Sequence, residues 1–343
     1  MKLGIVGLPN AGKSMLFEAL TRSMPTQNLS RRESRIGTIR VPDARVDFLS
    51  GLYLPKKTIY AQVEYLLPVV KGDSKEKDQN PWNEIKNCDA LIHVIRNFQA
   101  DGLPGPDPLK DFNSLDEEMR FADLLVVEKR LERLDLDQKR GKKADPDEAA
   151  LLNRCKEMLE QETPLRNDKE LAMSPLLKGY AFVSAKPMLI LLNNDDNDPD
   201  LPSCSGDINQ ENVLAVRGRL EYELSLMTEE EAKVFLTEFG ITTSAMDRVI
   251  AASYTLLGLI SFFTVGEDEV RAWTIKENTA ATEAAGVIHS DIKKGFIRAE
   301  VLAYADLIAA GSYKEARKRG TVRLEGKTYL VKDGDIIEFR FNV

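Results

Sequence analysis

The sequence predicts an α/β fold in which a mostly parallel sheet is covered by helices on both faces. Two observations favour it: strand-like and helix-like segments alternate through residues 1–100, and a glycine-rich loop follows the first strand-like segment. A third observation concerns the rest of the chain. Amphipathic helical patterns replace the alternation after Asp116, and β-forming residues with glycine turns return at the end. We therefore expect one large domain, a helical insertion and a small α+β unit.

The alternating region contains the strands of the predicted sheet. A helix is expected from Ser14 to about Arg22, because apolar residues recur there at helical spacing. Short apolar runs on either side of it predict strands. These runs are residues 3–7, 37–41, 62–70 and 90–98. Such alternation is typical of parallel sheets, since each parallel connection needs a crossover.

A helical hairpin is predicted in the middle of the chain. Apolar residues recur at spacings of three and four in two segments, which is the pattern of a coiled-coil seam. The charged segment 138–147 contains Gly141 and Pro146 and predicts the turn between the two helices. The seam residues are Leu124, Val127, Leu131 and Leu134 in the first helix, and Leu152, Cys155 and Leu159 in the second. The alternative is that both helices simply cover the domain.

Strand patterns return in the second half of the chain. The apolar run in residues 179–198 ends in an Asn/Asp cluster, which predicts a functional loop at the end of a strand. Residues 212–218 are the next strand candidate. Thr228 and Glu231 have capping-box spacing and predict the start of a helix. Residues 323–343 alternate β-formers with glycine turns, which indicates a small, separate α+β unit.

Composition limits the classes of function. The chain has 343 residues, a formal net charge of -8 and a mean hydropathy of -0.29, which exclude wholesale disorder and nucleic-acid binding by bulk positive charge. No apolar run is long enough to span a bilayer, so no membrane partner is expected. Cys88, Cys155 and Cys204 are widely spaced, which favours a reducing cytoplasm over disulfides or a zinc site. Of the two histidines, His93 is expected to be a hydrogen-bonded core residue, and His289 lies within the C-terminal segment 259–343.

Residues 7–14, GLPNAGKS, are the strongest functional signal. Gly7, Gly12, Lys13 and Ser14 satisfy the spacing G-x-x-x-x-G-K-S between a strand and a helix. Glycines let the backbone N–H groups turn toward phosphate oxygens, Lys13 reaches the β and γ phosphates, and Ser14 offers a hydroxyl to Mg²⁺. The N-terminus of the following helix adds partial positive charge. The motif predicts phosphate binding.

Several longer motifs resemble one family, the YchF or Obg-like ATPases. They are GLPNAGKS, VPDARVDFLSGLYLPKK, FADLLVVEKRLERL, SAKPMLILLNN, FFTVGEDEVRAWTIKENTAATEAAGVIHSDIKKGFIRAEVLAYADLI and RLEGKTYLVKDGDIIEFRFNV. The resemblance implies a P-loop domain with a G-domain-like sheet (residues 1–112 and 173–258), an inserted antiparallel coiled-coil hairpin (113–172) and a C-terminal TGS domain of the β-grasp fold (259–343). It also implies binding of ATP or GTP with Mg²⁺, slow hydrolysis, and a ribosome, RNA or protein partner for the hairpin and the TGS domain.

The resemblance also assigns the nucleotide ligands. The family's adenine-reading motif N-x-x-E matches residues 193–196, with Asp196 in place of the glutamate. Guanine readers use N-K-x-D, so this loop lies between the two patterns, and ATP is favoured on family grounds. Arg217 falls in the second base-side segment, where an arginine would stack on a purine or block it. The predicted nucleotide-binding residues are Asn10, Ala11, Gly12, Lys13, Ser14, Met15, Asn193, Asn194, Asp196 and Arg217, with Ser14 also the Mg²⁺ ligand.

Parts of the hydrolytic motifs are missing. Similar proteins have a D-x-x-G motif where this chain has residues 63–72, which are two residues shorter and lack that Asp and Gly. A polar run, residues 73–80, replaces the glycine-rich segment that usually follows. Arg31 stands where relatives have a threonine that binds Mg²⁺, with Ser30 and Ser34 as nearby hydroxyls. We therefore hypothesise weak or absent catalysis and assign no catalytic residue. The alternatives are a non-catalytic interaction scaffold with a vestigial P-loop, and an active GTPase.

Overall fold

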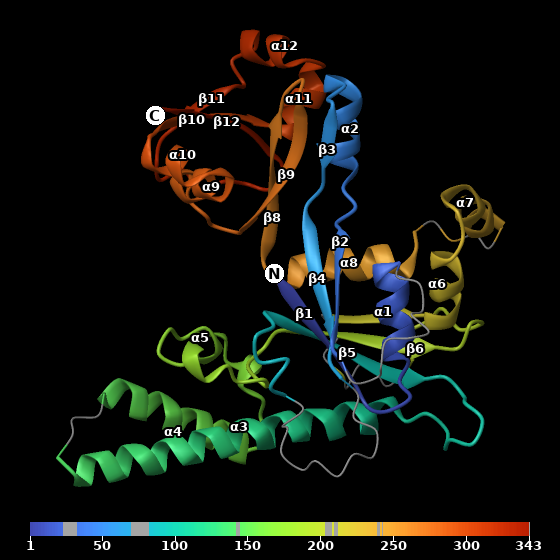
Figure 1. Ribbon diagram of the computed structural model, residues 1–343, viewed down its shortest axis with the longest axis vertical. Helices are drawn as coiled ribbons and strands as arrows, with labels where there is room; N and C mark the ends of the chain where they lie inside the picture. Colours follow the sequence, from blue (N-terminus) through green and yellow to red (C-terminus); the bar gives the residue numbers. More distant parts are fainter. Residues whose placement is uncertain are drawn as a thin grey trace. The chain divides into compact units, whose positions relative to one another are not determined.

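A computed structural model describes residues 1–22, 33–69, 82–141, 145–202, 208, 212–238, 241 and 243–342. It contains two six-stranded sheets and divides into two compact units. The first unit comprises Met1–Thr38 and Glu64–Val249, and the second comprises Ile39–Val63 and Ile250–Val343. Figure 1 shows the elements in sequence colours. The domain boundaries given above describe functional modules and stay a prediction.

The sheet of the first unit has the strand order β2-β4-β1-β5-β6-β7. The pairs β1/β4, β1/β5, β5/β6 and β6/β7 are parallel, which confirms the predicted mostly parallel sheet. β5 and β6 are almost wholly buried, as central strands covered on both faces must be. The strands are β1 (Lys2–Val6), β2 (Arg35–Arg40), β4 (Gln62–Leu67), β5 (Ala90–Asn97), β6 (Met188–Asn194) and β7 (Val213–Val216).

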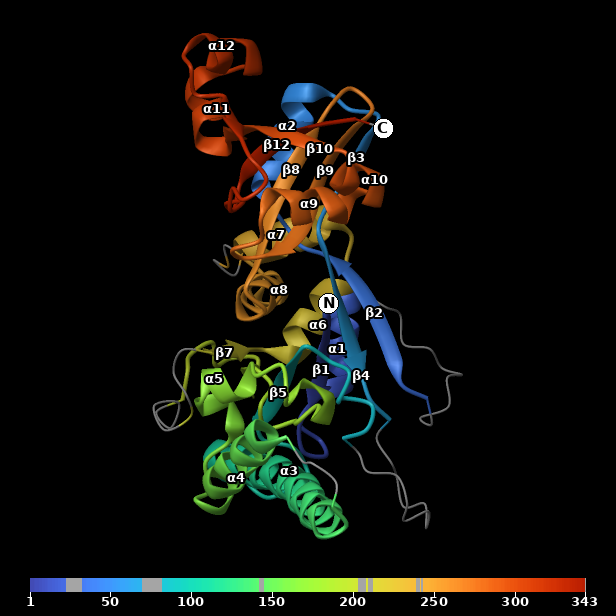
Figure 2. The same ribbon diagram turned by 90° about the vertical axis from the view of Figure 1, so that its left-hand side faces the viewer.

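Helices cover both faces of this sheet. α1 (Lys13–Thr21) packs against α6 (Gly218–Ser225), and the two lie side by side in Figure 2. α3 (Pro108–Lys139) covers β5 and buries Leu115 and Met119 in a core that includes Ile95 and Leu192. The other helices of this unit are α4 (Pro146–Glu160), α5 (Lys169–Ala172), α7 (Glu229–Glu238) and the 3-10 turns η1 (Leu165–Asn167) and η2 (Lys178–Tyr180). α8 (Ala245–Leu256) begins in the first unit and ends in the second.

The capping box predicted at Thr228 is present. The Glu231 N–H donates to the Thr228 hydroxyl at 3.3 Å, and the Thr228 N–H donates to the Glu231 carboxylate at 2.9 Å. Two donors at the start of α7 are thereby satisfied reciprocally, which confirms the helix start from a short-range pattern.

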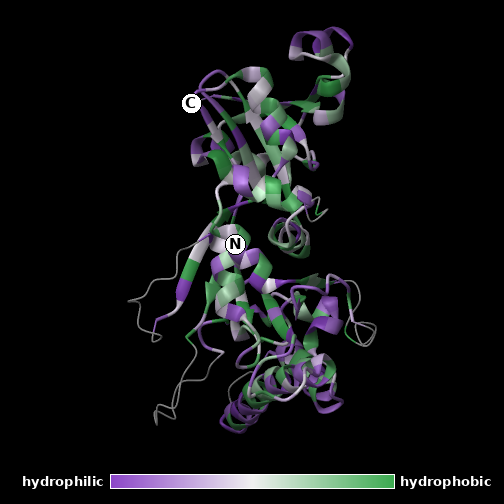
Figure 3. Cartoon of the chain, turned by 90° about the vertical axis from the view of Figure 1, so that its right-hand side faces the viewer, coloured by the Kyte–Doolittle hydropathy of each residue, from purple (hydrophilic) through white to green (hydrophobic). Residues whose placement is uncertain are grey.

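α3 and α4 form the predicted hairpin and lie side by side in Figures 1 and 2. Figure 3 shows hydrophilic and hydrophobic residues mixed along both helices, as expected for a narrow apolar seam. α3 is the longer helix, because its first half packs on the sheet and only its second half faces α4. The buried seam consists of Val127, Leu134, Leu152, Cys155 and Leu159, with Leu124 and Leu131 partly buried beside it. The seam prediction is confirmed.

The second unit is a mixed sheet with short helices, ordered β11-β10-β12-β8-β9-β3. β8 and β9 pair antiparallel, as do β10 with β12 and with β11, whereas β12/β8 and β3/β9 are parallel. This confirms the predicted α+β unit at the end of the chain. Its elements are β8 (Leu259–Val265), β9 (Glu269–Lys276), α9 (Ala281–Ile288), α10 (Ser290–Lys294), β10 (Phe296–Ala303), α11 (Tyr304–Ala310), α12 (Tyr313–Lys318), β11 (Arg323–Glu325) and β12 (Asp335–Phe341).

Residues 39–63 also belong to the second unit, which the sequence analysis did not anticipate. They form α2 (Ala44–Tyr53) and β3 (Lys57–Ile59), and β3 becomes the last strand of the second sheet. Arg45 donates to Asp333 at 2.7 Å, and Phe48 packs edge-on against Tyr304 at 5.8 Å. These partners are far away in sequence, so no local pattern indicates the pairing.

Candidate functional site

The predicted P-loop follows β1 directly and leads into α1. Its turn needs left-handed backbone: φ is 151° at Gly7, 64° at Asn10 and 95° at Gly12. A Cβ on Gly7 would collide with the Val94 carbonyl, and one on Gly12 would collide with the Asn193 amide. Both glycines are therefore required by conformation and by space, and the cradle that they leave fits phosphate.

Lys13 folds back over this loop. Its Nζ donates to the carbonyl oxygens of Gly7 at 2.8 Å and Leu8 at 2.7 Å. The side chain is half-buried, and burial lowers the pKa of its ammonium to about 8. The ammonium thus stands over the loop, and a phosphate oxygen would offer it a charged acceptor in place of neutral carbonyls.

Ser14 and Met15 lie in the first turn of α1, where both are exposed. A hydroxyl is a suitable hard-oxygen ligand for Mg²⁺, so Ser14 would hold the ion together with phosphate oxygens. In the described part of the chain, β4 ends at Leu67, which is buried and apolar and offers no carboxylate to such an ion, and Pro68 follows. Among the residues that the structure describes, no group of three or more His, Cys, Asp or Glu side chains is placed to bind a metal.

Two of the departures noted in the sequence, Arg31 and the polar run 73–80, fall outside the described residues. The nearby hydroxyl of Ser30 also falls outside them. Ser34 is described and is exposed just before β2.

Asn193, near the end of β6, joins the P-loop to α6. Its Nδ2 donates to the Ala11 carbonyl at 3.0 Å, and its Oδ1 accepts from the Gly218 N–H at 2.9 Å. The side chain is buried, and a Cβ on Gly218 would lie 2.6 Å from its Oδ1. One amide therefore connects the phosphate end of the predicted site to the segment that contains Arg217.

The other two residues of the predicted base-reading motif, Asn194 and Asp196, have different roles. Asn194 is buried; it donates to the carbonyls of Asp198 at 3.0 Å and Asp200 at 2.6 Å and accepts from Asn97 at 2.9 Å. Its amide therefore builds the loop. The Asp196 carboxylate is partly exposed and lies 3.8 Å from Arg219 Nε, so it remains open to a ligand.

Arg217 stands at the N-cap of α6 without a side-chain cap bond. Its Nη1 instead donates to the Asp196 carbonyl oxygen at 3.3 Å. The structure thus brings the predicted residues of the P-loop, of β6 and of the α6 start into one site. Sequence reasoning missed Asn97, which lies opposite Asn194 in the β5/β6 register, and Arg219.

The two histidines take no part in this site. His93 is fully buried and stacks on Phe112 at 5.8 Å, yet neither ring nitrogen has a hydrogen-bond partner. The expectation of a hydrogen-bonded core histidine is therefore wrong, because burial of the ring brings no hydrogen-bond partner to either nitrogen. Burial lowers the pKa of His93 to about 3, so the ring is neutral. His289 caps α10 and accepts from the Asp291 N–H at 3.2 Å.

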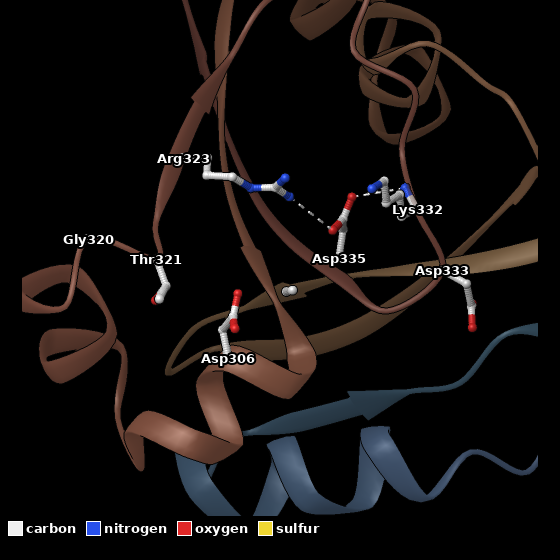
Figure 4. Close-up of a pocket in the computed structure, with 8 residues that line it drawn as sticks. Asp306, Gly320, Thr321, Arg323, Lys332, Asp333 and Asp335 are labelled. Carbon is white, nitrogen blue, oxygen red and sulfur yellow. Dashed lines mark hydrogen bonds and ion pairs between the residues drawn. The ribbon is translucent and has the colours of Figure 1, made fainter.

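A separate pocket of about 330 Å³ lies in the second unit and is shown in Figure 4. Its buried carboxylate, Asp335, accepts from the Tyr329 hydroxyl at 2.8 Å and from the Lys332 N–H at 2.9 Å. Asp333 accepts from Arg45 and from the Ser261 N–H. These carboxylates already have protein partners, so they support the fold of the unit.

Known proteins are similar to this chain over its full length. The family model described as a 50S ribosome-binding GTPase matches residues 2–130, and the model of the YchF C-terminal domain, described as a protein of unknown function (DUF933), matches residues 259–342. The ribosome-binding ATPase YchF of Bacillus subtilis is 40% identical over 364 residues, covering 99% of each chain. This chain belongs to the YchF family. The resemblance inferred from the motifs is therefore confirmed.

Other YchF relatives extend the comparison. Obg-like ATPase 1 of Caenorhabditis elegans is 35% identical, with 100% of this chain and 92% of the relative covered. The solved structure of the Schizosaccharomyces pombe YchF GTPase matches with a TM-score of 0.83 at 29% identity, covering 99% of this chain and 97% of that chain. The fold class is thereby confirmed. Because these names divide between ATPase and GTPase, the base preference must be argued from the site.

Proposed function

We propose that this chain binds a purine nucleoside triphosphate with Mg²⁺ at the P-loop, with ATP favoured and GTP the alternative. The observation that carries the proposal is the bridge made by Asn193, which joins Ala11 of the P-loop to Gly218 beside Arg217. A site that binds only phosphate has no need of such a link, whereas a nucleotide site must hold its phosphate and base ends in register. The names of the relatives, ATPases of the YchF family, support ATP.

We further propose that hydrolysis is weak or lost. Phosphoryl transfer needs a Mg²⁺ ion that is held by the P-loop hydroxyl and by an acidic side chain from a second strand. It also needs a group that senses the γ-phosphate. Ser14 supplies one side, but the strand that should supply the acidic partner ends in buried Leu67. The same observation favours a second candidate, a non-catalytic scaffold with a vestigial P-loop, because nucleotide then has few contacts with which to change the protein.

Calorimetric titration with a non-hydrolysable ATP analogue, with and without Mg²⁺, tests the function. We expect Mg²⁺-dependent binding that Lys13→Ala weakens about 100-fold, through loss of a charge-assisted contact with phosphate. Lys139→Ala is the control for loss of one positive charge, since Lys139 is exposed on α3. Phosphate release from ATP should be no faster than in Lys13→Ala. Absence of binding by either the ATP or the GTP analogue would leave the scaffold as the function.

The proposed partner is the ribosome, in the cytoplasm. Relatives named ribosome-binding ATPases support it, and so does the motif-based assignment of a hairpin at 113–172 and a TGS domain at 259–343. In the described residues, no helix has the length and apolarity to cross a bilayer. We expect the protein to co-sediment with ribosomal subunits at moderate salt in at least one nucleotide state. Its absence from those fractions with ATP, GTP and no nucleotide would count against this partner.

A further inference from the structure

We propose that the pocket of the second unit shown in Figure 4 binds a small zwitterion, a free α-amino acid. The pocket is formed by residues of that unit alone, so the inference does not depend on the proposed nucleotide binding. Its volume of about 330 Å³ lies at the small end of the range for ligand sites, about 300–1,000 Å³. Side chains of both charges line it, so the argument asks which of those charges still lack a partner.

The cationic side of the pocket is built on Arg323 in β11. Its guanidinium donates to the Tyr329 hydroxyl at 3.1 Å and lies over the Tyr329 ring, 5.5 Å from the ring centroid. The carboxylates of Glu325 and Asp335 are each 3.8 Å away, beyond hydrogen-bonding distance. A guanidinium carries several N–H donors in a planar fork. The fork is therefore held in place and still has donors for a carboxylate.

A buried carboxylate stands beside that guanidinium. The Asp335 side chain is 3% exposed, and its Oδ2 accepts from the Tyr329 hydroxyl at 2.8 Å and from the Lys332 N–H at 2.9 Å. Within the described residues, its Oδ1 has no donor at hydrogen-bonding distance and lies 3.8 Å from Arg323 Nη2. Because an ionised carboxylate accepts through both oxygens, a donor on a ligand would complete the contacts of Asp335.

Two other charged side chains line the pocket without a partner among the residues that the structure describes. They are the Asp306 carboxylate and the Lys332 ammonium. Figure 4 shows the Asp306 carboxylate pointing from the first turn of α11 into the pocket. Asp333 differs, since it points away from the other side chains and accepts from Arg45 at 2.7 Å. The open charges are thus one carboxylate and one ammonium, in addition to the Arg323 fork.

These open charges select against a simple ion. An inorganic anion would be attracted by Arg323 and Lys332 but repelled by Asp306, and a simple cation would meet the reverse. A molecule with a carboxylate and an ammonium on neighbouring atoms matches both signs. Its carboxylate would take the Arg323 fork, and its ammonium would lie between Asp306 and Oδ1 of Asp335. An α-amino acid has this arrangement.

The remaining walls favour an amino acid with a small side chain. Ala303 and Gly320 provide little apolar surface for a large one. The Thr321 hydroxyl donates to the Ala316 carbonyl at 3.1 Å and can still accept a hydrogen bond. Glycine, L-alanine and L-serine are therefore the probes of choice.

The test is an NMR titration of the full chain with these amino acids, and separately with acetate and methylammonium, which each carry one of the charges of glycine. The backbone amide signals of Thr321 and Lys332 report on the pocket, and that of Gly12 reports on the P-loop. We expect the amino acids to shift the first pair of signals, but not Gly12, with a dissociation constant of about 1 mM or lower. Acetate and methylammonium should each bind at least about tenfold more weakly, because each meets one charge alone.

Asp306→Asn separates ligand recognition from folding. Because Asp306 has no partner in the described residues, its neutral variant should keep the wild-type unfolding midpoint. The amino acids should bind about tenfold more weakly, whereas acetate should bind equally well or better, since a repulsive charge is gone. Glu277→Gln is the control, because it removes an exposed carboxylate from the same unit outside the pocket. It should change neither affinity.

Lys332→Gln tests the other open charge. It should weaken the amino acids and acetate together, by about threefold or more, because both present a carboxylate. Lys327→Gln is its control, since Lys327 is exposed in the same unit and does not line the pocket. Neither variant removes Arg323, whose loss next to buried Asp335 would endanger the fold.

Three results would overturn the proposal. The first is the absence of shifts at Thr321 and Lys332 with every amino acid. The second is equal affinity for glycine and acetate, which would make the pocket a simple anion site. The third is a parallel loss of glycine and acetate binding in Asp306→Asn, which would mean that Asp306 shapes the pocket and does not contact an ammonium. None of these results bears on nucleotide binding at the P-loop.

Discussion

Replacing Asn193 with alanine is expected to destabilise the first unit by about 2–4 kcal/mol and to weaken nucleotide binding at the same time. The substitution leaves the Ala11 carbonyl and the Gly218 N–H without their partner in a buried setting. Each unsatisfied buried group costs about 1–3 kcal/mol. Because the same amide holds the P-loop to the start of α6, stability and affinity should fall together.

Unfolding in urea, followed by fluorescence, measures this effect. The chain has two tryptophans, Trp82 in the first unit and Trp273 in the second, so a Trp273→Phe background leaves a reporter for the first unit alone. Asn153→Ala is the control, since Asn153 bonds only within its own exposed helix turn and should cost less than about 0.5 kcal/mol. If Asn193→Ala unfolds at the same urea concentration as this control, the bridge is not a stabilising element.

Asp116→Ala should destabilise the first unit by about 3–5 kcal/mol, the usual cost of removing one partner from a buried ion pair. Asp116 is 6% exposed and lies 2.5 Å from Arg166 and 3.2 Å from Arg120. Without the Asp116 carboxylate, the guanidinium groups of Arg120 and Arg166 lose this ion-pair partner while they remain largely buried. Hydrogen exchange at the start of α3 should increase as well.

Asp135→Ala is the matched control on the same helix. Asp135 pairs with Lys139 four residues on, as Asp116 does with Arg120, but both of its pair's side chains are more than half exposed. Its loss should cost about 0.5 kcal/mol or less. Equal losses for the two variants would show that burial of the first pair carries no extra stability.

Much of the fold could be predicted because it follows from patterns between residues close in sequence. Alternation of apolar segments predicted the parallel sheet, and the spacing of Val127 and Leu134 predicted the seam of the hairpin. Thr228 and Glu231 predicted a helix start that the hydrogen bonds confirm. In each case the pattern itself lies in a short stretch of sequence, so spacing alone carries the information.

The base side of the candidate site was less accessible to prediction. The motif placed Asn193 and Asp196 in the site, but spacing does not say that Asn194 turns toward Asn97 or that Arg217 donates to the Asp196 carbonyl. The role of His93 was mistaken for the same reason. A buried-strand pattern predicts burial, whereas the presence of a hydrogen-bond partner depends on what other elements bring to that place.

The sequence by itself determined the fold class, the phosphate-binding loop, the hairpin and the absence of the D-x-x-G motif, because each follows from patterns in short stretches of sequence. Only the tertiary structure decided that residues 39–63 complete the second sheet, that one amide links the P-loop to α6, and that Arg217 stands beside Asp196. Those contacts join segments far apart in the chain. They form only when burial of the two sheets and their helices brings distant backbone groups to within hydrogen-bonding distance.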